Sequence, residues 1–422
     1  WTVKIKLGIF FADDPAFKGK RRELTAADFV YAVKRFVDPA NKSPASSNVI
    51  DLTLIGLGAL RERALKDRAP FDYDTEIEGL RALDRTTIQY KLEQPRPRFV
   101  ESPLTSHDLF GAVAREVVEA YGEDIPAHPV GTGPFRLVQW RRSSLIVLEK
   151  NPAYREVFYE AEPAADDAEG RAFVERFKGR RLPMIDRVEV SIIEESQPHW
   201  LGFLSGQIDF VNVPLEFANQ ALPGGRLAPH LAKRGLRLRR EMEADSAYTY
   251  FNMEDPVVGG YTPERVALRR AIALAMNVPR EIGVVRRSQA IPAQSPIVPH
   301  TSGYDPAFKS EMGDHDPQRA KALLDLYGYN DRDGDGFRER PDGQPLTLVV
   351  ATQSDALSRT FDELLQKSME AVGIRVRFAI GQWPEQLKQA RAGKLMLWQL
   401  GGSAASLDGA ESLQRYHSAQ IG

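Results

Sequence analysis

Alternating acidic residues in the last quarter of the chain are the clearest candidates for metal chemistry. Asp331, Asp333 and Asp335 occupy every second position, and Gly336 follows them. Counting Asp331 as position 1 of a loop puts carboxylates at positions 1, 3, 5, 9 and 12 and glycine at position 6. Oxygen ligands at these spacings, with glycine at the sharp turn, are typical of a calcium loop. The further ligands would be the backbone carbonyl of Phe337 and the carboxylates of Glu339 and Asp342.

The last position of this loop departs from the usual pattern. Asp342 is shorter than the glutamate that commonly closes a calcium loop with two oxygens, and the shorter side chain should weaken the site. A polar turn that joins a helix ending at Gly328 to a strand starting at Leu346 would explain the same residues. The sequence therefore predicts no required cofactor and allows one calcium ion, with a structural rather than a regulatory role.

Aromatic residues form a second candidate group, for contact with a ligand. Trp383 and Trp398 lie near the end of the chain, and Tyr248, Tyr250 and Phe251 lie close together before them. Flat, rigid side chains of this kind offer surface on which a ligand can stack. Packing in a core is the more common role of any one of them. Loop-forming and polar neighbours flank Trp383, so we expect it to be the more exposed tryptophan.

The motifs of common enzyme classes are missing from the sequence. It contains no HExxH, GxSxG or GxxxxGK[ST] motif, and its 7 histidines are scattered without metal-ligand spacing. We therefore expect a protein that is not an enzyme. Two alternatives stay open, a hydrolase with a carboxylate or serine site of unfamiliar pattern and a calcium-stabilised structural module.

Composition excludes several further classes. Lys and Arg number 56 against 58 Asp and Glu, for a formal net charge of -2, and this balance argues against nucleic acid as the main partner. Cysteine is absent, which excludes disulfides and thiolate chemistry. No apolar run approaches the roughly 18 residues of a membrane span.

In the first half of the chain, local patterns predict a mixture of helices and antiparallel strands. A helix should start at Thr25, with Asp28 at the capping position, and end before Asp38. Residues 135–140 and 145–150 read as a hairpin, and residues 157–182 as an exposed excursion. The following elements are expected to be a strand at 188–193, a helix at 197–204 and strands at 207–213 and 248–251.

The second half of the chain alternates expected helices and strands, as an α/β domain does. Helices are expected from residue 263, at 316–328, at 356–372 and at 384–392, with strands at 346–351, 374–380 and 395–400. Alternating strands and helices predict a sheet with right-handed crossovers. Ligands of such sheets gather beyond the carboxyl ends of the strands, so residues 401–408 become candidates for a binding site.

The chain opens within a strand-like alternation at residues 1–7 and stops shortly after another strand. We interpret it as a fragment of a longer protein that lacks both termini, with any targeting signal outside the fragment.

Several stretches together resemble one family, the family 5 extracellular solute-binding proteins of peptide- and nickel-type ABC importers. Residues 24–39 resemble its TAxD…kR…DP signature, and residues 129–140 resemble its PVGTGPY…W signature. Further matching stretches follow in family order at residues 148–154, 206–209, 250–252 and 268–275. Each motif alone is weak, whereas the ordered set is specific.

The resemblance implies an α/β, two-lobed periplasmic-binding-protein-like fold with an extra subdomain in the first lobe. The expected parts are residues 1–130 for the extra subdomain, 131–252 for the core of the first lobe and 253–422 for the second lobe. The lobes would pivot about the stretch from Tyr250 to Asn252. The implied function is capture of a small solute, peptide-like by default, for delivery to an ABC importer permease. We expect a monomer in the periplasm or tethered outside the membrane.

The resemblance also indicates a set of ligand-binding residues, with one departure. The set comprises Tyr250, Asn252, Trp383, Trp398, Gly401, Gly402, Ser403, Ala404, Ala405 and Asp408. Peptide binders of the family carry an aspartate for the α-ammonium group of the peptide where this chain has Ala405, and a tryptophan where it has Gly402. Burying an ammonium group without a carboxylate partner is costly. Recognition of a free amine is therefore in doubt unless Asp408 takes over that role.

Overall fold

The fold is described from a computed structural model, which covers the chain except residues 97, 102–103, 106–109, 405–406, 415 and 418–422. The chain packs as two compact units, residues 1–199 and 200–422. The expected part limits at residues 130 and 252 follow from the resemblance and stay predictions. Among the described residues, no helix combines the length and the apolar character that crossing a membrane requires.

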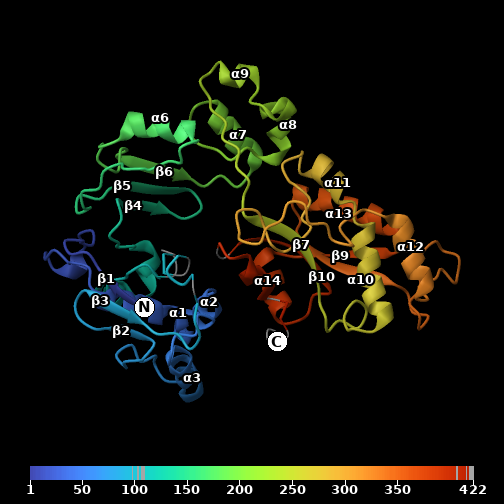
Figure 1. The fold of residues 1–422 in the computed structure, drawn as a ribbon, viewed down its shortest axis with the longest axis horizontal. Helices are drawn as coiled ribbons and strands as arrows, with labels where there is room; N and C mark the ends of the chain where they lie inside the picture. The colour runs from blue at the N-terminus through green and yellow to red at the C-terminus, as the bar shows by residue number, and fades with distance from the viewer. Residues whose placement is uncertain (97, 102–103, 106–109, 405–406, 415, 418–422) are drawn as a thin grey trace. The chain divides into compact units, whose positions relative to one another are not determined.

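Unit 1 is built around two separate three-stranded antiparallel sheets (Figure 1). The first sheet has the order β1-β3-β2 and the second the order β4-β5-β6. The strands are β1 (Thr2–Lys4), β2 (Leu80–Ala82), β3 (Thr87–Tyr90), β4 (Phe135–Arg141), β5 (Leu145–Lys150) and β6 (Arg187–Ser191). The helices are α1 (Ala26–Val37), α2 (Ser46–Ile50), α3 (Leu57–Asp67), α5 (Arg115–Tyr121) and α6 (Ala168–Phe177). Helix α7 (Ser196–Leu204) leads from unit 1 into unit 2.

In unit 1 the structure contains the helix and the hairpin that the local sequence patterns predict. The hairpin β4–β5 is confirmed, with a register shift between Leu137 and Gln139. At the start of α1, the Thr25 backbone N–H donates to the Asp28 carboxylate at 2.7 Å, as the capping pattern predicts. Asp28 is 3% exposed and also accepts from Arg22 at 2.6 Å, so the cap is tied into the packing of the unit.

The excursion at residues 157–182 is exposed as expected, and it contains helix α6, none of whose residues is buried. One expectation for an extended segment was wrong. The strand expected at residues 207–213 does not form, because that segment finds no neighbouring strand among the described residues. Its apolar residues Val211 and Val213 pack instead against the cluster around Trp200. The alternation of apolar residues therefore reflects packing against this cluster and not pairing in a sheet.

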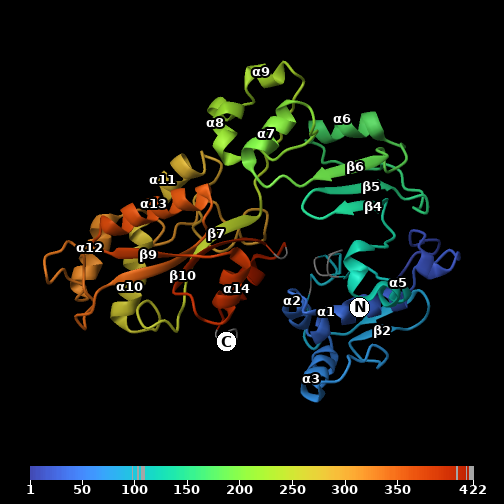
Figure 2. The ribbon, with the colours of Figure 1, turned by 180° about the vertical axis from the view of Figure 1, so that it is seen from behind.

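Unit 2 is a three-layer α/β arrangement (Figures 1 and 2). Its sheet has the order β7-β10-β8-β9, in which β8, β9 and β10 are parallel and β7 runs antiparallel to β10. The strands are β7 (Asp245–Phe251), β8 (Thr347–Thr352), β9 (Arg375–Ile380) and β10 (Leu397–Ser403). The helices are α8 (Ala218–Ala221), α9 (Pro229–Ala232), α10 (Pro263–Ala275), α11 (Val278–Arg280), α12 (Pro317–Leu326), α13 (Ala356–Glu370), α14 (Trp383–Arg391) and α15 (Gly409–Gln414).

The two faces of this sheet are covered by different helices. Leu348, Val350 and Leu397 pack with residues of α10, α12 and α13 in the main core of the unit. On the other face, Trp398 and Ala351 pack with Leu387 and Ala390 of α14. The alternation of successive side chains along each strand produces this division. The predicted strand and helix order of the α/β part is confirmed, with shifts of a few residues at the ends.

Candidate functional site

Strands β7 and β10 extend beyond their parallel neighbours and form a two-stranded ribbon. Strand β10 pairs with β8 only at Leu397 and Trp398, whereas it pairs with β7 along its whole length. Gly401, Gly402 and Ser403, expected to follow the strand as a loop, are its last residues. They stay extended because residues 245–247 of β7 supply a ladder partner on that side.

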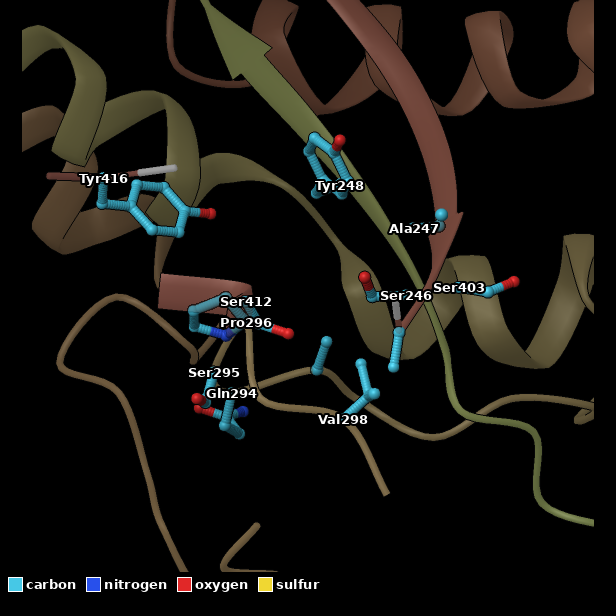
Figure 3. Close-up of a pocket in the computed structure, with 13 residues that line it drawn as sticks. Ser246, Ala247, Tyr248, Gln294, Ser295, Pro296, Val298, Ser403, Ser412 and Tyr416 are labelled. Atoms are coloured by element: carbon cyan, nitrogen blue, oxygen red, sulfur yellow. The ribbon is translucent and has the colours of Figure 1, made fainter. Parts of the chain in front are cut away.

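A pocket of about 320 Å³ lies along this ribbon (Figure 3). One wall comes from the ribbon, a second from residues 293–298 within the proline-rich segment 291–304, and a third from the region of α15. The lining residues are Ser246, Ala247, Tyr248, Ala293, Gln294, Ser295, Pro296, Val298, Gly402, Ser403, Ala404, Ser412 and Tyr416. All of them belong to unit 2, so the pocket is a feature of that unit by itself.

The proline-rich wall is held in place by a side-chain amide. Gln294 accepts a hydrogen bond from the Ser310 backbone N–H at 3.0 Å and donates one to the Gly313 carbonyl at 3.3 Å. The hydroxyl oxygen of Ser295 accepts from the Ile297 N–H at 3.0 Å. These bonds give a segment without regular structure a defined path past the pocket.

The wall near α15 is fixed by contacts at the start of that helix. Asp408 accepts from the Ala410 N–H at 3.0 Å and from the Ser302 hydroxyl at 3.3 Å. Gly409 passes so close to Ser302 that an added Cβ would lie 2.3 Å from its carbonyl oxygen. Asp408 is not among the residues that line the pocket; its carboxylate positions α15 at the edge of it.

The described lining carries no residue that is charged at neutral pH. The hydroxyl-bearing residues of the lining are Ser246, Tyr248, Ser295, Ser403, Ser412 and Tyr416. The other described residues of the lining are small or apolar, except Gln294, whose amide is already hydrogen-bonded to Ser310 and Gly313. The pocket therefore offers hydrogen bonds and apolar contact, without an ion-pair partner from these residues.

Three of the aromatic candidates, Trp383, Trp398 and Tyr250, lie together beside α14, whereas Phe251 packs against the main core on the other face of the sheet. Trp398 is 1% exposed and Trp383 is 50% exposed, and their ring centroids lie 6.2 Å apart. Tyr250 lies opposite Trp398 in the β7–β10 ladder. Its hydroxyl is buried and has no hydrogen-bond partner among the described residues, and this burial raises the pKa of Tyr250. The expectation that Trp383 is the more exposed tryptophan is confirmed.

Helix α14 is held to the carboxyl ends of the neighbouring strands by one buried amide. Gln386 is 3% exposed and donates to the carbonyls of Thr352 at 2.6 Å and Ala379 at 3.2 Å. Its amide oxygen accepts from Gln353 at 3.1 Å. This network fixes the helix that carries Trp383 at its first position.

The structure brings together part of the predicted ligand set. Gly402, Ser403 and Ala404 line the pocket, whereas Gly401 does not. Asn252 ties the end of β7 to the turn before β10, through a hydrogen bond from its amide to the Gly393 carbonyl at 2.9 Å. Ala405 lies outside the described residues. The ligand roles of these residues stay predictions.

Sequence reasoning missed most of the pocket wall. It named Tyr248 only as an aromatic residue, and it passed over Ser246, Gln294, Ser295, Ser412 and Tyr416. Serine and glutamine occur on most protein surfaces, so nothing in their local pattern marked them. A prediction that residues 245–251 pair with residues 397–403 would have brought Ser246 and Tyr248 to Gly402.

The expected calcium loop is partly assembled. Carboxylate oxygens of Asp331, Asp333 and Asp335 lie within 4.8 Å of one another on the surface. The backbone N–H of Gly336, at φ +90°, donates to Asp331 at 2.9 Å. Three converging carboxylates suit a hard cation such as calcium.

The later positions of the loop serve other contacts. Glu339 is 9% exposed and accepts from the Arg332 backbone N–H at 2.8 Å. Asp342 pairs with Arg340 at 3.3 Å and lies outside the group of three. Arg375 also pairs with Asp335 at 2.6 Å and offsets part of the negative charge. Calcium binding thus stays a prediction, carried by the first three positions.

Comparisons with known proteins extend over the whole chain. The sequence profile of the bacterial extracellular solute-binding proteins, family 5 Middle, matches residues 1–422. The chain is 26% identical over 415 residues to di/tripeptide-binding protein 2 of Pseudomonas aeruginosa, covering 97% of this chain and 66% of that protein. It is 24% identical over 408 residues to the probable deoxycholate-binding periplasmic protein YgiS of Escherichia coli, covering 94% of this chain and 64% of that protein.

A solved structure shows the fold. The structure of OppA from Burkholderia pseudomallei matches with a TM-score of 0.69 at 21% identity, covering 100% of this chain and 72% of that one. The expected α/β, periplasmic-binding-protein-like fold is confirmed by this match. The chain spans just under two thirds of the length of the two curated relatives. On the match of the family profile to its entire length, the chain belongs to the bacterial extracellular solute-binding proteins of family 5.

Proposed function

We propose that this chain captures a small solute outside the cytoplasmic membrane and passes it to the permease of an ABC importer. Membership of the family supports the class of function. The observation that carries the proposal to particular residues is the pocket along the β7–β10 ribbon, which lies where ligands of parallel sheets gather. The working form is proposed to be a monomer, in the periplasm or tethered to the outer side of the membrane.

The solute is proposed to be a small organic molecule, peptide-like by default. One relative is named for binding di- and tripeptides, and another is named as a probable deoxycholate-binding protein. A peptide and a steroid differ in shape and charge, so relatives at this level of identity do not fix the solute. Both solutes enter the binding test below.

The pocket chemistry supports binding without bond cleavage. A serine hydroxyl attacks a substrate only when a base beside it takes its proton. The described lining offers several hydroxyls but no histidine or carboxylate that could act as that base. Asp408, close to the pocket, already accepts two hydrogen bonds from the structure that holds α15. A hydrolase is therefore the weaker proposal.

Two adjacent glycines provide a matched test of the pocket. An added Cβ at Gly402 would meet nothing within 4 Å, so the fold should tolerate a larger residue there. In Gly402→Leu the new side chain would enter the cavity of about 320 Å³ next to Ser246 and obstruct a solute there. We expect the affinity for a bound di- or tripeptide or for deoxycholate to fall at least tenfold, measured by isothermal titration calorimetry on the full-length protein.

Gly401→Leu is the control. A Cβ at Gly401 would lie 3.9 Å from the Ser246 carbonyl oxygen, an ordinary contact, and Gly401 does not line the pocket. If the pocket, rather than the whole set of residues predicted from the sequence, holds the solute, this variant should keep the affinity of the parent protein. Equal affinities in both variants would remove the pocket from the proposal, and a parent protein that binds no solute in a wide screen would remove the proposed function itself.

A further inference from the structure

We propose that the part of the solute held in this pocket is uncharged and carries groups that donate and accept hydrogen bonds, such as hydroxyls or carboxamides. This inference rests on the proposed function and specifies the chemistry of the same site. It is carried by the lining itself, in which the described residues include five hydroxyl-bearing side chains, Ser246, Tyr248, Ser295, Ser412 and Tyr416, and no charged side chain. Ser403 also belongs to the lining, but it pairs with Asp245 and its side chain lies on that face of the ribbon.

Hydroxyl groups suit such a partner because each can turn its hydrogen toward an acceptor or present its oxygen to a donor. The oxygen of Ser295 is already bonded to the Ile297 N–H, which leaves the Ser295 hydrogen to donate. In Figure 3 the hydroxyls of Ser246 and Tyr416 lie on opposite walls of the pocket. A polar group between the walls would thus meet partners on both sides.

A charged group would find no comparable partner among the lining residues that the structure describes. An ion that leaves water needs an opposite charge or several well-placed hydrogen bonds to offset its loss of hydration. Asp245 is next to Ser246 in β7, and successive side chains of a strand point to opposite faces. Asp245 and Asp408 are both outside the lining, and Asp408 is bonded to Ala410 and Ser302.

Apolar contact completes the description of the bound group. Ala247, Ala293, Pro296, Val298 and Ala404 supply small or rigid surfaces between the hydroxyls. Gly402 lies opposite Ser246 in the ladder and brings no side chain into the pocket. The pocket suits a compact chemical group that carries polar atoms on an apolar framework. An amide-rich peptide end and a sugar both have this combination.

Three probes separate charge from hydrogen bonding in calorimetric titrations of the full-length protein. Trialanine carries a free ammonium and a carboxylate, N-acetyl-trialanine amide has the same backbone without charge, and maltotriose offers uncharged hydroxyls. We expect one of the uncharged probes to bind at least tenfold more tightly than trialanine. Binding of the blocked peptide would show that the pocket takes a solute with carboxamide groups. Binding of maltotriose would show that it takes a solute with hydroxyl groups.

The opposite results overturn the inference. Tighter binding of trialanine than of both uncharged probes would show that the pocket accepts a charged end. Failure of all three probes would also reject the inference, whereas the proposed function would survive if deoxycholate or another solute still bound in a manner sensitive to Gly402→Leu.

A substitution within the pocket tests the same claim in reverse. Ser246→Asp places a carboxylate opposite Gly402, so it should weaken the uncharged probe at least tenfold and shift the preference toward trialanine. Ser246→Ala removes the hydroxyl without adding charge, so it should lower the affinity for the uncharged probe only a few-fold. Circular dichroism of both variants checks the fold, and an unchanged preference in a folded Ser246→Asp protein would contradict the proposal.

Discussion

Gly402 and Ser246 face each other across two antiparallel strands, and the small size of both leaves room for the pocket. Glycine weakens a strand interior because it loses more backbone freedom than other residues on folding. Gly402 carries this cost in stability, and its lack of a side chain keeps the pocket open. At the scale of the residue, the binding proposal therefore depends as much on an absent side chain as on the hydroxyls around it.

The two tryptophans beside α14 should respond differently to truncation. Trp398 is 1% exposed, so Trp398→Ala should lower the free energy of unfolding by about 3–5 kcal/mol. Trp383 is 50% exposed, so Trp383→Ala should leave most of the stability in place and should reduce the affinity for the solute. Urea unfolding and calorimetry measure the two effects separately. An unchanged affinity would make Trp383 a purely structural residue.

At the scale of the element, the loop between α12 and β8 connects a helix and a strand that both pack in the main core of unit 2. It has no regular structure of its own, and its acidic residues accept hydrogen bonds from its own backbone. Close carboxylates repel one another, and Arg375 relieves only part of that repulsion at Asp335. A cation that bound between them would stabilise the folded form of the loop.

Calcium should accordingly raise the melting temperature of the parent protein relative to a sample in chelator. A ligand that binds only the folded state at a hundredfold excess over its dissociation constant adds about 2.7 kcal/mol of stability. Asp333→Asn should abolish most of the difference because it removes one of the three carboxylates. Asp314→Asn, at an exposed ion pair outside the loop, should keep the difference. Identical melting of the parent protein with and without calcium would end this hypothesis.

At the scale of the whole molecule, the chain consists of two compact units, and the pocket belongs to the second. Proteins of several units often unfold in more than one step, so a single unfolding free energy does not describe them. A solute that binds the described pocket stabilises first the unit that contains it. The thermal behaviour of the full-length protein therefore reports where a solute binds as well as whether it binds.

Calorimetric melting should show this effect directly. With a bound solute at a hundredfold excess over its dissociation constant, the transition that includes unit 2 should gain about 2.7 kcal/mol of stability. Gly402→Leu should lose this gain, because the solute no longer fits the pocket. A shift of the same size in Gly402→Leu would place the solute elsewhere.

The sequence by itself determined the features that depend on near neighbours. The start of α1 follows from Thr25 and Asp28, which are three positions apart, and the β4–β5 hairpin follows from two strand-like runs around one turn. The alternating elements of unit 2 were predictable for the same reason, since helical hydrogen bonds and strand alternation involve residues close in the chain. The ordered motifs also indicated the family, which the profile match confirms.

Only the tertiary structure decided where the pocket lies and what lines it. Ser403 pairs with Asp245, 158 positions earlier, and this pairing extends β10 past its expected end at Leu400 and brings Ser246 to Gly402. The wall at residues 293–298 and the start of α15 depend on contacts such as Ser302 with Asp408, which have no local signature. Pairing between distant segments is selected by the burial and hydrogen bonding of the whole unit, so no short stretch of sequence could specify it.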